Sequence, residues 1–233
     1  MVRFLLLFLI TLYSFSTFAQ QEKLLFSQAL DMYLPKYKSN VKEAYRLKHD
    51  EKARFLFDSL VKNCLIGTYM DDFKVRDISK DKETLYQYQK PIFLITYASW
   101  CVTDKGEVPA LNQLAREYGE DVQFVVLFWD KRSEALDAAS KYSGYIDVLY
   151  VNELSNKHDF VVKNLKHALG FPTVYQIGSD KQIIDIQRLK KLPFPASFED
   201  SFNLNYATIS SGVSNIVAHE KELLSTVEFA ITD

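Results

Sequence analysis

Two almost continuous apolar stretches, residues 91–97 and residues 122–128, constrain the fold of this chain more than any other feature. A strand with one exposed face alternates apolar and polar residues, whereas a strand buried on both faces is apolar nearly throughout. Residues 107–118, between the two stretches, carry a helical pattern of apolar positions. The pattern therefore predicts an α/β architecture, in which helices cover a β-sheet.

Further helices and strands are predicted on both sides of this central unit. Residues 22–62 predict one or two amphipathic helices that Pro35 separates, and we interpret them as a packing or dimerising extension because they contain no cluster of metal-binding side chains. The later predicted elements are a helix over 133–141, a strand over 147–151, a helix over 159–168, a hairpin of strands 173–177 and 182–186 with its turn at 178–181, and a final helix near 213–229.

The charge composition argues against two classes of partner. The chain has 233 residues, 28 of them basic and 30 acidic, which gives a net charge of −2. The two signs are interspersed, so no stretch predicts the one-sided basic surface that nucleic acids or anionic lipids favour. We therefore expect a globular chain of one domain plus additions, with no nucleic-acid partner.

The first 19 residues have the composition of a secretory signal peptide. Arg3 precedes an apolar run over residues 4–12, and Thr17 and Ala19 in the segment 17–19 supply small residues at the positions that a signal peptidase reads. The apolar run is short for a membrane span, which needs about 20 residues, so a membrane location is expected only if the segment stays uncleaved. The prediction is an exported mature chain that starts at Gln20.

The chain has two cysteines, Cys64 and Cys101. Export would place them in an oxidising compartment, but two are too few for a disulfide scaffold. Either they pair with each other, or at least one is a thiol that takes part in chemistry. Cys64 lies beside Leu65 and Ile66 and fits the role of a small buried apolar residue better than Cys101 does.

The segment around Cys101 matches a thiol-disulfide active site in part. Trp100 precedes the cysteine, Glu107 follows it by six residues, and Pro109 follows by eight. A dithiol site has a second cysteine three residues after the first, and this chain has Asp104 there.

Four stretches together resemble the thioredoxin-fold proteins of the TlpA/ResA type, which are exported bacterial thiol-disulfide oxidoreductases. They are residues 67–73 (Gly-Thr-Tyr-Met-Asp-Asp-Phe), the Trp100-Cys101 segment with Glu107 and Pro109, Asp130 after the second apolar run, and residues 170–173 (Gly-Phe-Pro-Thr). Met70 and Asp71 depart from the family's usual Ala-Pro. The resemblance covers roughly residues 67–189 and implies a thioredoxin fold with a mixed central sheet.

The resemblance also implies roles for individual residues. Cys101 would be the nucleophile, at the start of a helix that Pro109 kinks, and the bond before Pro172 would be cis. Trp100, Phe171, Pro172 and Thr173 would then line a groove for an extended peptide, and no cofactor would be needed. Glu107 would be either a proton acceptor beside Cys101 or a solvated helix residue.

Asp104 is the departure that bears on the reaction. A mixed disulfide at Cys101 would have to wait for an external thiol, because the second thiol normally resolves it. If Cys101 and Asp104 share one face of a helix, the carboxylate also disfavours the thiolate. We expect a less acidic thiol than that of a dithiol enzyme, with Asp104 counted among the reactive-site residues.

Two functions are consistent with these residues. The first is an exported monothiol or impaired thiol-disulfide oxidoreductase that acts on cell-envelope protein thiols, in a bacterial periplasm. The second is a redox-inactive protein that binds a peptide or protein in the Pro172 groove. A peroxidase is disfavoured because Ala98 and Leu94 occupy the positions where peroxiredoxins have Thr and Pro.

The remaining features predict no further chemistry. His158 and His167 are nine residues apart, too far for two ligands one turn apart on a helix, so no metal site is predicted. We divide the chain into a signal peptide (1–19), a helical extension (20–62), a thioredoxin-like domain (63–190) and a C-terminal tail with a helix (191–233).

Overall fold

The computed structural model describes residues 23–78, 84–101, 103–151, 165, 168–189 and 196–232, with side chains up to residue 226 in the last helix. The helical elements are α2 (Phe26–Arg46), α3 (Asp50–Leu60), a π-helical turn η1 (Val61–Leu65), a 3₁₀ turn η2 (Leu85–Gln87), α4 (Glu107–Tyr118), α5 (Arg132–Ala139) and α7 (Phe198–Thr232). The strands are β1 (Arg76–Asp77), β2 (Ile92–Tyr97), β3 (Gln123–Phe128), β4 (Ile146–Tyr150), β5 (Thr173–Ile177) and β6 (Ile183–Arg188).

The strands form one mixed sheet in the order β1-β4-β3-β2-β5-β6. The parallel strands β2 and β3 pair from Ile92↔Gln123 to Tyr97↔Phe128, and β4 continues the parallel part. The hairpin β5–β6 adds to the other side of β2 in the antiparallel sense. All six residues of β2 are buried, as the continuous apolar run predicts.

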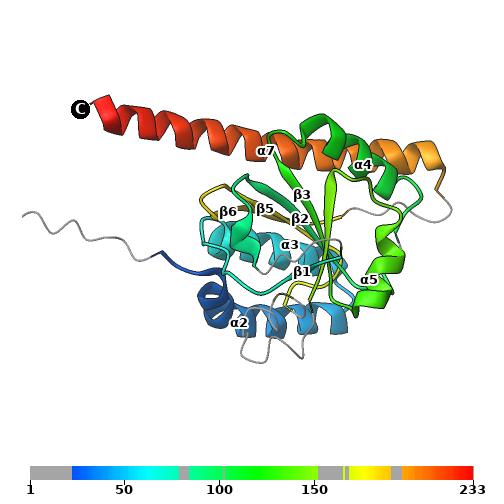
Figure 1. Cartoon of the computed structure of the whole chain (residues 1–233). Helices are drawn as coiled ribbons and strands as arrows, with labels where there is room; N and C mark the ends of the chain where they lie inside the picture. Colours follow the sequence, from blue (N-terminus) through cyan, green and yellow to red (C-terminus); the bar gives the residue numbers. More distant parts are fainter. Residues whose placement is uncertain are drawn as a thin grey trace, which may run out of the picture.

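Helices pack on both faces of this sheet (Figure 1). Alternate residues of β2 point to opposite faces, so Ile92 and Leu94 lie in one core with α2 and α3, whereas Phe93 and Ile95 lie in the other with α4 and α7. The N-terminal helices are thus part of the main core, in which Phe26 is fully buried with its ring edge against Tyr175. The α/β prediction is confirmed.

The predicted break at Pro35 is wrong. Helix α2 continues through Pro35, although a proline inside a helix removes one backbone hydrogen bond and costs about 3 kcal/mol. Leu30, Leu34 and Tyr37 continue one buried face on both sides of the proline, and this burial outweighs the lost bond. The chain instead leaves the helix near Lys48, whose φ of 55° is incompatible with helix continuation.

The last helix is longer than the sequence pattern predicts, because it begins at Phe198 and not near residue 213. Its first half contributes Ile209, Val213 and Ile216 to the core, and its C-terminal end extends past the sheet (Figure 1). Most of the predicted helix over 159–168 lies outside the described residues. Within the parts of the chain that are described, no helix combines the length and apolarity needed to cross a membrane.

Candidate functional site

Cys101 lies in the loop that follows β2, at the edge of the sheet where the carboxyl ends of β2 and β3 meet. The loop begins with a tight turn. The Cys101 N–H donates to the carbonyl oxygen of Ala98 at 2.8 Å, and the Ala98 N–H donates to Cys101 Sγ at 3.4 Å. A backbone donor thus faces the sulfur of a half-buried side chain.

The prediction that Cys101 starts a helix is wrong, because α4 begins six residues later at Glu107. This later start accommodates Pro109 at lower cost. A helix that started at Cys101 would place this proline in its interior, whereas in α4 it lies in the first turn, where its missing N–H breaks no bond. Pro109 therefore removes no hydrogen bond from α4, and the kink that the sequence suggested is not required.

Asp104 consequently does not share a helix face with Cys101. Both residues lie in the loop before α4, and Asp104 Oδ2 is buried without a hydrogen-bond partner among the described residues. One oxygen of the carboxylate that stands at the position of the second sulfur is thus buried with no hydrogen-bond donor from the described residues.

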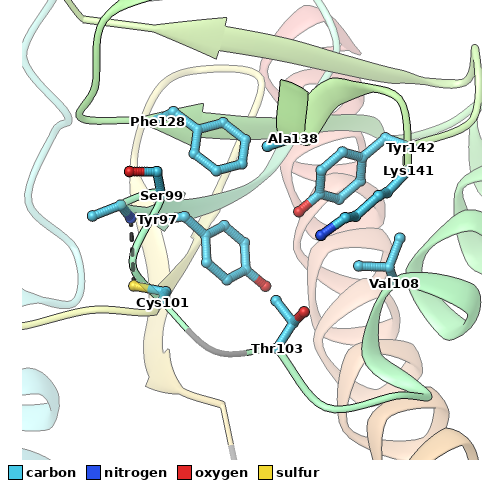
Figure 2. Close-up of a pocket in the computed structure, with 10 residues that line it drawn as sticks. Tyr97, Ser99, Cys101, Thr103, Val108, Phe128, Ala138, Lys141 and Tyr142 are labelled. Carbon is cyan, nitrogen blue, oxygen red and sulfur yellow. Dashed lines mark hydrogen bonds between the residues drawn. The ribbon is translucent and has the colours of Figure 1, made fainter. Parts of the chain in front are cut away.

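Behind Cys101 lies a small pocket that Figure 2 shows in close-up. The side chains of Tyr97 and Tyr142 project into it from β2 and from the segment after α5, and Thr103 and Val108 also border it (Figure 2). The residues that line it are Tyr97, Ala98, Ser99, Cys101, Thr103, Val108, Phe128, Ala138, Lys141 and Tyr142.

Glu107 is buried beside this pocket, with 2% of its surface exposed, so the interpretation of Glu107 as a solvated helix residue is wrong. The Tyr97 hydroxyl donates to Glu107 Oε1, and the Asp104 N–H donates to Oε2 at 3.4 Å. Burial, followed by the nearby Glu107 carboxylate, raises the pKa of Tyr97 well above 10.0. The same two causes raise the pKa of Tyr142, so both phenols keep their protons at neutral pH.

We expect Tyr97→Phe to lower the free energy of unfolding at pH 7 by about 1–3 kcal/mol, because it removes the hydrogen bond that the Tyr97 hydroxyl donates to a buried carboxylate. Urea unfolding measures the change. Tyr206→Phe is the matched control, since the Tyr206 hydroxyl donates to Glu117 at 2.8 Å on an exposed surface, and we expect little change there. A cost at Tyr97 no larger than at Tyr206 would mean that the hydrogen bond to Glu107 contributes nothing.

The same variant has a pH signature. The raised pKa means that folded Tyr97 holds its proton at pH values where the unfolded chain has lost it, so the stabilisation is present below pH 10.0 and decreases as the pH rises above it. Between pH 10 and 11, wild-type stability should therefore decrease more steeply than that of Tyr97→Phe. If the stability of the wild type and of Tyr97→Phe decreased equally with pH, the raised pKa of Tyr97 would be contradicted.

The loop that precedes β5 lies against the Cys101 loop. The Phe171–Pro172 peptide bond is cis, and the ring of Phe171 contacts Trp100 edge-on at 6.2 Å and Trp129 at 6.4 Å between centroids. Trp100 is 72% exposed, whereas Phe171 and Pro172 are half-buried. Trp100 and Phe171 thus form one aromatic surface beside the Cys101 loop, and Pro172 follows Phe171 directly in the chain.

Thr173 is fully buried at the start of β5 and pairs with Thr96 of β2. Its hydroxyl donates to the carbonyl oxygen of Gly170 at 2.8 Å, and its own carbonyl oxygen accepts the Thr96 hydroxyl at 3.2 Å. The side chain holds the loop in place. A direct contact of Thr173 with a substrate stays a prediction.

One curated relative and several solved structures are similar to part of this chain. The thioredoxin-like protein YneN of Bacillus subtilis (strain 168) is 22% identical over 121 residues, which cover 52% of this chain and 69% of the relative. No family model matches the chain.

Among solved structures, a hypothetical protein from Sinorhizobium meliloti 1021 superposes with a TM-score of 0.52 at 15% identity, over 68% of this chain and 87% of that one. The thioredoxin domain of a thiol-disulfide oxidoreductase from Bacteroides vulgatus gives 0.49 at 12% identity, over 64% and 98%. A thiol:disulfide interchange protein from a Bacteroides species gives 0.47 at 14% identity, over 63% and 88%.

The strand order, the parallel β2-α4-β3 unit, the antiparallel β5–β6 hairpin and the cis Pro172 decide the assignment. The chain has the thioredoxin fold. The fold predicted from four short sequence stretches is therefore confirmed. Three of the predicted site regions, around Cys101, Glu107 and Pro172, lie at one edge of its sheet.

The two cysteines lie on opposite faces of this thioredoxin-fold sheet and form no disulfide with each other. Cys64, in η1, packs against the core with α2 and α3, whereas Cys101 packs against the core with α4 and α7. Cys64 is therefore not placed to resolve a mixed disulfide on Cys101. Any resolving thiol has to come from outside the chain.

Sequence reasoning missed the residues that hold this site. Tyr97 was treated only as part of an apolar strand, and Ser99 and Tyr142 were not singled out. Asp130 was noted only as the end of the second apolar run. A signal was available for Asp130, because the carboxyl ends of adjacent parallel strands meet at one edge and bring the residues after them together.

The described residues contain no group of three or more His, Cys, Asp or Glu side chains that could hold a metal ion. His158 and His167 lie outside the described part of the chain.

Proposed function

We propose that the protein exchanges thiols and disulfides with other proteins through Cys101 alone. The observation that carries the proposal is the loop after β2, where the Cys101 sulfur accepts the Ala98 N–H beside an exposed Trp100 and the cis Pro172 loop. A backbone donor to sulfur favours the thiolate, which is the form that attacks a disulfide. Protein disulfides or thiols are the proposed substrates.

The bonds and electrons of the proposed thiol-disulfide exchange balance without a cofactor. The Cys101 thiolate attacks one sulfur of a substrate disulfide, a bond forms between them, and the second substrate sulfur leaves as a thiolate. An external thiolate then attacks the mixed disulfide, forms a new disulfide with the substrate sulfur and releases the Cys101 thiolate. The external thiol supplies the electrons that an internal second cysteine would otherwise supply.

The proposed location is the cell envelope. The support is the signal-like segment over residues 1–19, which lies outside the described residues. Cell-envelope protein thiols are then the proposed partners, and a membrane location would follow only if the segment stayed uncleaved.

A defined substrate tests the proposal. Cys64→Ser leaves Cys101 as the single thiol, and Cys101→Ser leaves Cys64 as the matched control. Each protein is incubated with insulin, alkylated and examined by non-reducing gel electrophoresis and mass spectrometry. We expect a covalent adduct with an insulin chain only for Cys64→Ser, and dithiothreitol should release it. No adduct with either variant, or equal adducts with both, would contradict the proposal.

The alternative is a redox-inactive protein that binds a peptide on the surface formed by Trp100, Phe171 and Pro172. Asp104 favours this function, because a carboxylate replaces the second sulfur and its Oδ2 is buried without a hydrogen-bond partner among the described residues. The insulin experiment separates the two functions, since peptide binding alone leaves no covalent adduct.

A further inference from the structure

The geometry of the Cys101 sulfur depends on a turn that is fixed from the neighbouring strand. Within residues 98–101, the Cys101 N–H bonds to the Ala98 oxygen and the Ala98 N–H points at Sγ. The dashed line in Figure 2 marks the bond to sulfur. No helix begins at Cys101, so this N–H takes the place of a helix N-terminus as a backbone donor directed at the sulfur.

Asp130 holds the middle of that turn. The pairing of β2 with β3 continues one residue past β3, where the Trp129 N–H donates to the Tyr97 oxygen at 3.0 Å. The next residue, Asp130, accepts the Ser99 N–H at 2.6 Å on one carboxylate oxygen and the Ser99 hydroxyl at 2.8 Å on the other. Two short bonds to one carboxylate fix both the position and the orientation of Ser99.

We propose that Asp130 is a positioning residue for Cys101, which clamps Ser99 so that the Ala98 N–H stays directed at Sγ. The inference rests on the proposed function of Cys101 and adds a residue that acts through the turn. We call the two hydrogen bonds from Ser99 to Asp130 the clamp. A hydrogen-bond donor to the charged form of a thiol lowers its pKa, so the clamp favours the thiolate because it keeps the Ala98 N–H directed at Sγ.

The charge of Asp130 acts in the opposite direction. A carboxylate near the sulfur disfavours a second negative charge, so a purely electrostatic Asp130 would suppress the thiolate. Removal of Asp130 should therefore slow the reaction of Cys101 if the residue positions the turn, and accelerate it if the residue acts only as a charge. The two roles therefore predict opposite changes in the reaction rate of Cys101.

Other titratable groups surround Cys101 from the adjoining elements. They are Tyr97 on β2, Asp104 in the loop, Glu107 on α4, and Lys141 and Tyr142 after α5. None of them is altered in the Asp130 and Ser99 variants, so differences among those variants report on the clamp.

The experiment measures the rate of Cys101 alkylation by iodoacetamide from pH 5 to 10, in the Cys64→Ser background of the full chain. We expect Asp130→Ala to slow the reaction at pH 7 about fivefold and to shift its pH midpoint upward, as the weakening of one hydrogen bond to a charged group predicts. Ser99→Ala should shift the midpoint the same way, although it leaves the carboxylate in place.

Asp130→Asn is the conservative variant. Its amide oxygen can accept the Ser99 N–H while its amide N–H donates to the Ser99 oxygen, so we expect the rate to stay within about twofold of the parent. Asp104→Asn is the matched control for charge, because Asp104 Oδ2 accepts no hydrogen bond from the described residues. That control should react about twofold faster at pH 7.

Faster alkylation of Asp130→Ala, or an unchanged midpoint in both alanine variants, would overturn the positioning role. Circular dichroism and urea midpoints establish that each variant is folded. The assay reports on the thiolate itself and needs no disulfide substrate, so it distinguishes failure of the clamp from failure of the proposed exchange, which the insulin experiment tests.

Discussion

Asp104→Cys is expected to raise the rate of insulin reduction by dithiothreitol at least tenfold over that of the wild type. The variant restores two thiols three residues apart, so the mixed disulfide on Cys101 can be resolved within the chain. An internal reaction avoids the entropy of bringing in a second molecule, which is worth several powers of ten in well-oriented cases, and a gain of about tenfold allows for imperfect geometry. Turbidity of the precipitating insulin chains measures the rate.

Two variants separate the effect of the sulfur from the effect of the charge. Asp104→Ser removes the carboxylate without supplying a thiol, and we expect at most a small gain from a more acidic Cys101. Asp104→Cys combined with Cys101→Ser should be inactive, because the nucleophile is missing. If Asp104→Cys folds, has its expected thiols and still matches the wild type, the missing sulfur is not what limits turnover.

Strands β2 and β3 were predictable because a strand that is buried on both faces is apolar nearly throughout. Helix α4 between them was predictable from the helical spacing of its apolar residues. The apolar run over 91–97 became β2, and α4 has the predicted bounds Glu107–Tyr118. The cis bond before Pro172 followed from a family resemblance, and the structure confirms it. Each of these features could be predicted from the residues of one short stretch of sequence, without knowledge of its contacts with other elements.

The local geometry of Cys101 was not predictable in the same way, because it depends on groups from other elements. The predicted helix start was wrong, because α4 begins at Glu107 and holds Pro109 in its first turn, where the missing N–H costs no hydrogen bond. The burial of Glu107 depends on Tyr97, ten residues away, and on the packing of α4 against the sheet. Such pairs become visible only when the sheet order is known.

Pro35 is a second case in which contacts with other elements override a local sequence signal. Its local preference to end a helix is strong, yet the buried face of α2 continues across it from Leu30 to Tyr37. Tertiary packing decided the outcome, and it was not apparent from the spacing of apolar residues alone. The early start of α7 has a similar cause, since the polar residues Ser201 and Asn205 are buried within its first half.

Gly106→Ala is expected to destabilise the protein by about 3 kcal/mol, because the added methyl group has no space. A Cβ at this position would lie 2.1 Å from the Phe202 nitrogen and 2.5 Å from the Phe202 Cα, both backbone atoms of α7. The Gly106 N–H also donates to Ser201 Oγ at 3.0 Å, so α7 contacts the chain directly before α4. Helix α7 would have to move outward, which loosens the packing of its buried residues, such as Ile209, against the sheet.

Gly144→Ala is the matched control for the change in backbone entropy. Gly144 is exposed, and a Cβ there would meet no atom within 4 Å. We expect this variant to be neutral or slightly stabilising, since alanine restricts the unfolded chain. Urea unfolding compares the two, and limited proteolysis within α7 should become faster only in Gly106→Ala. Equal stability of both variants would mean that α7 can shift away from residue 106 without loss of packing, and that the docking of this helix contributes little to the fold.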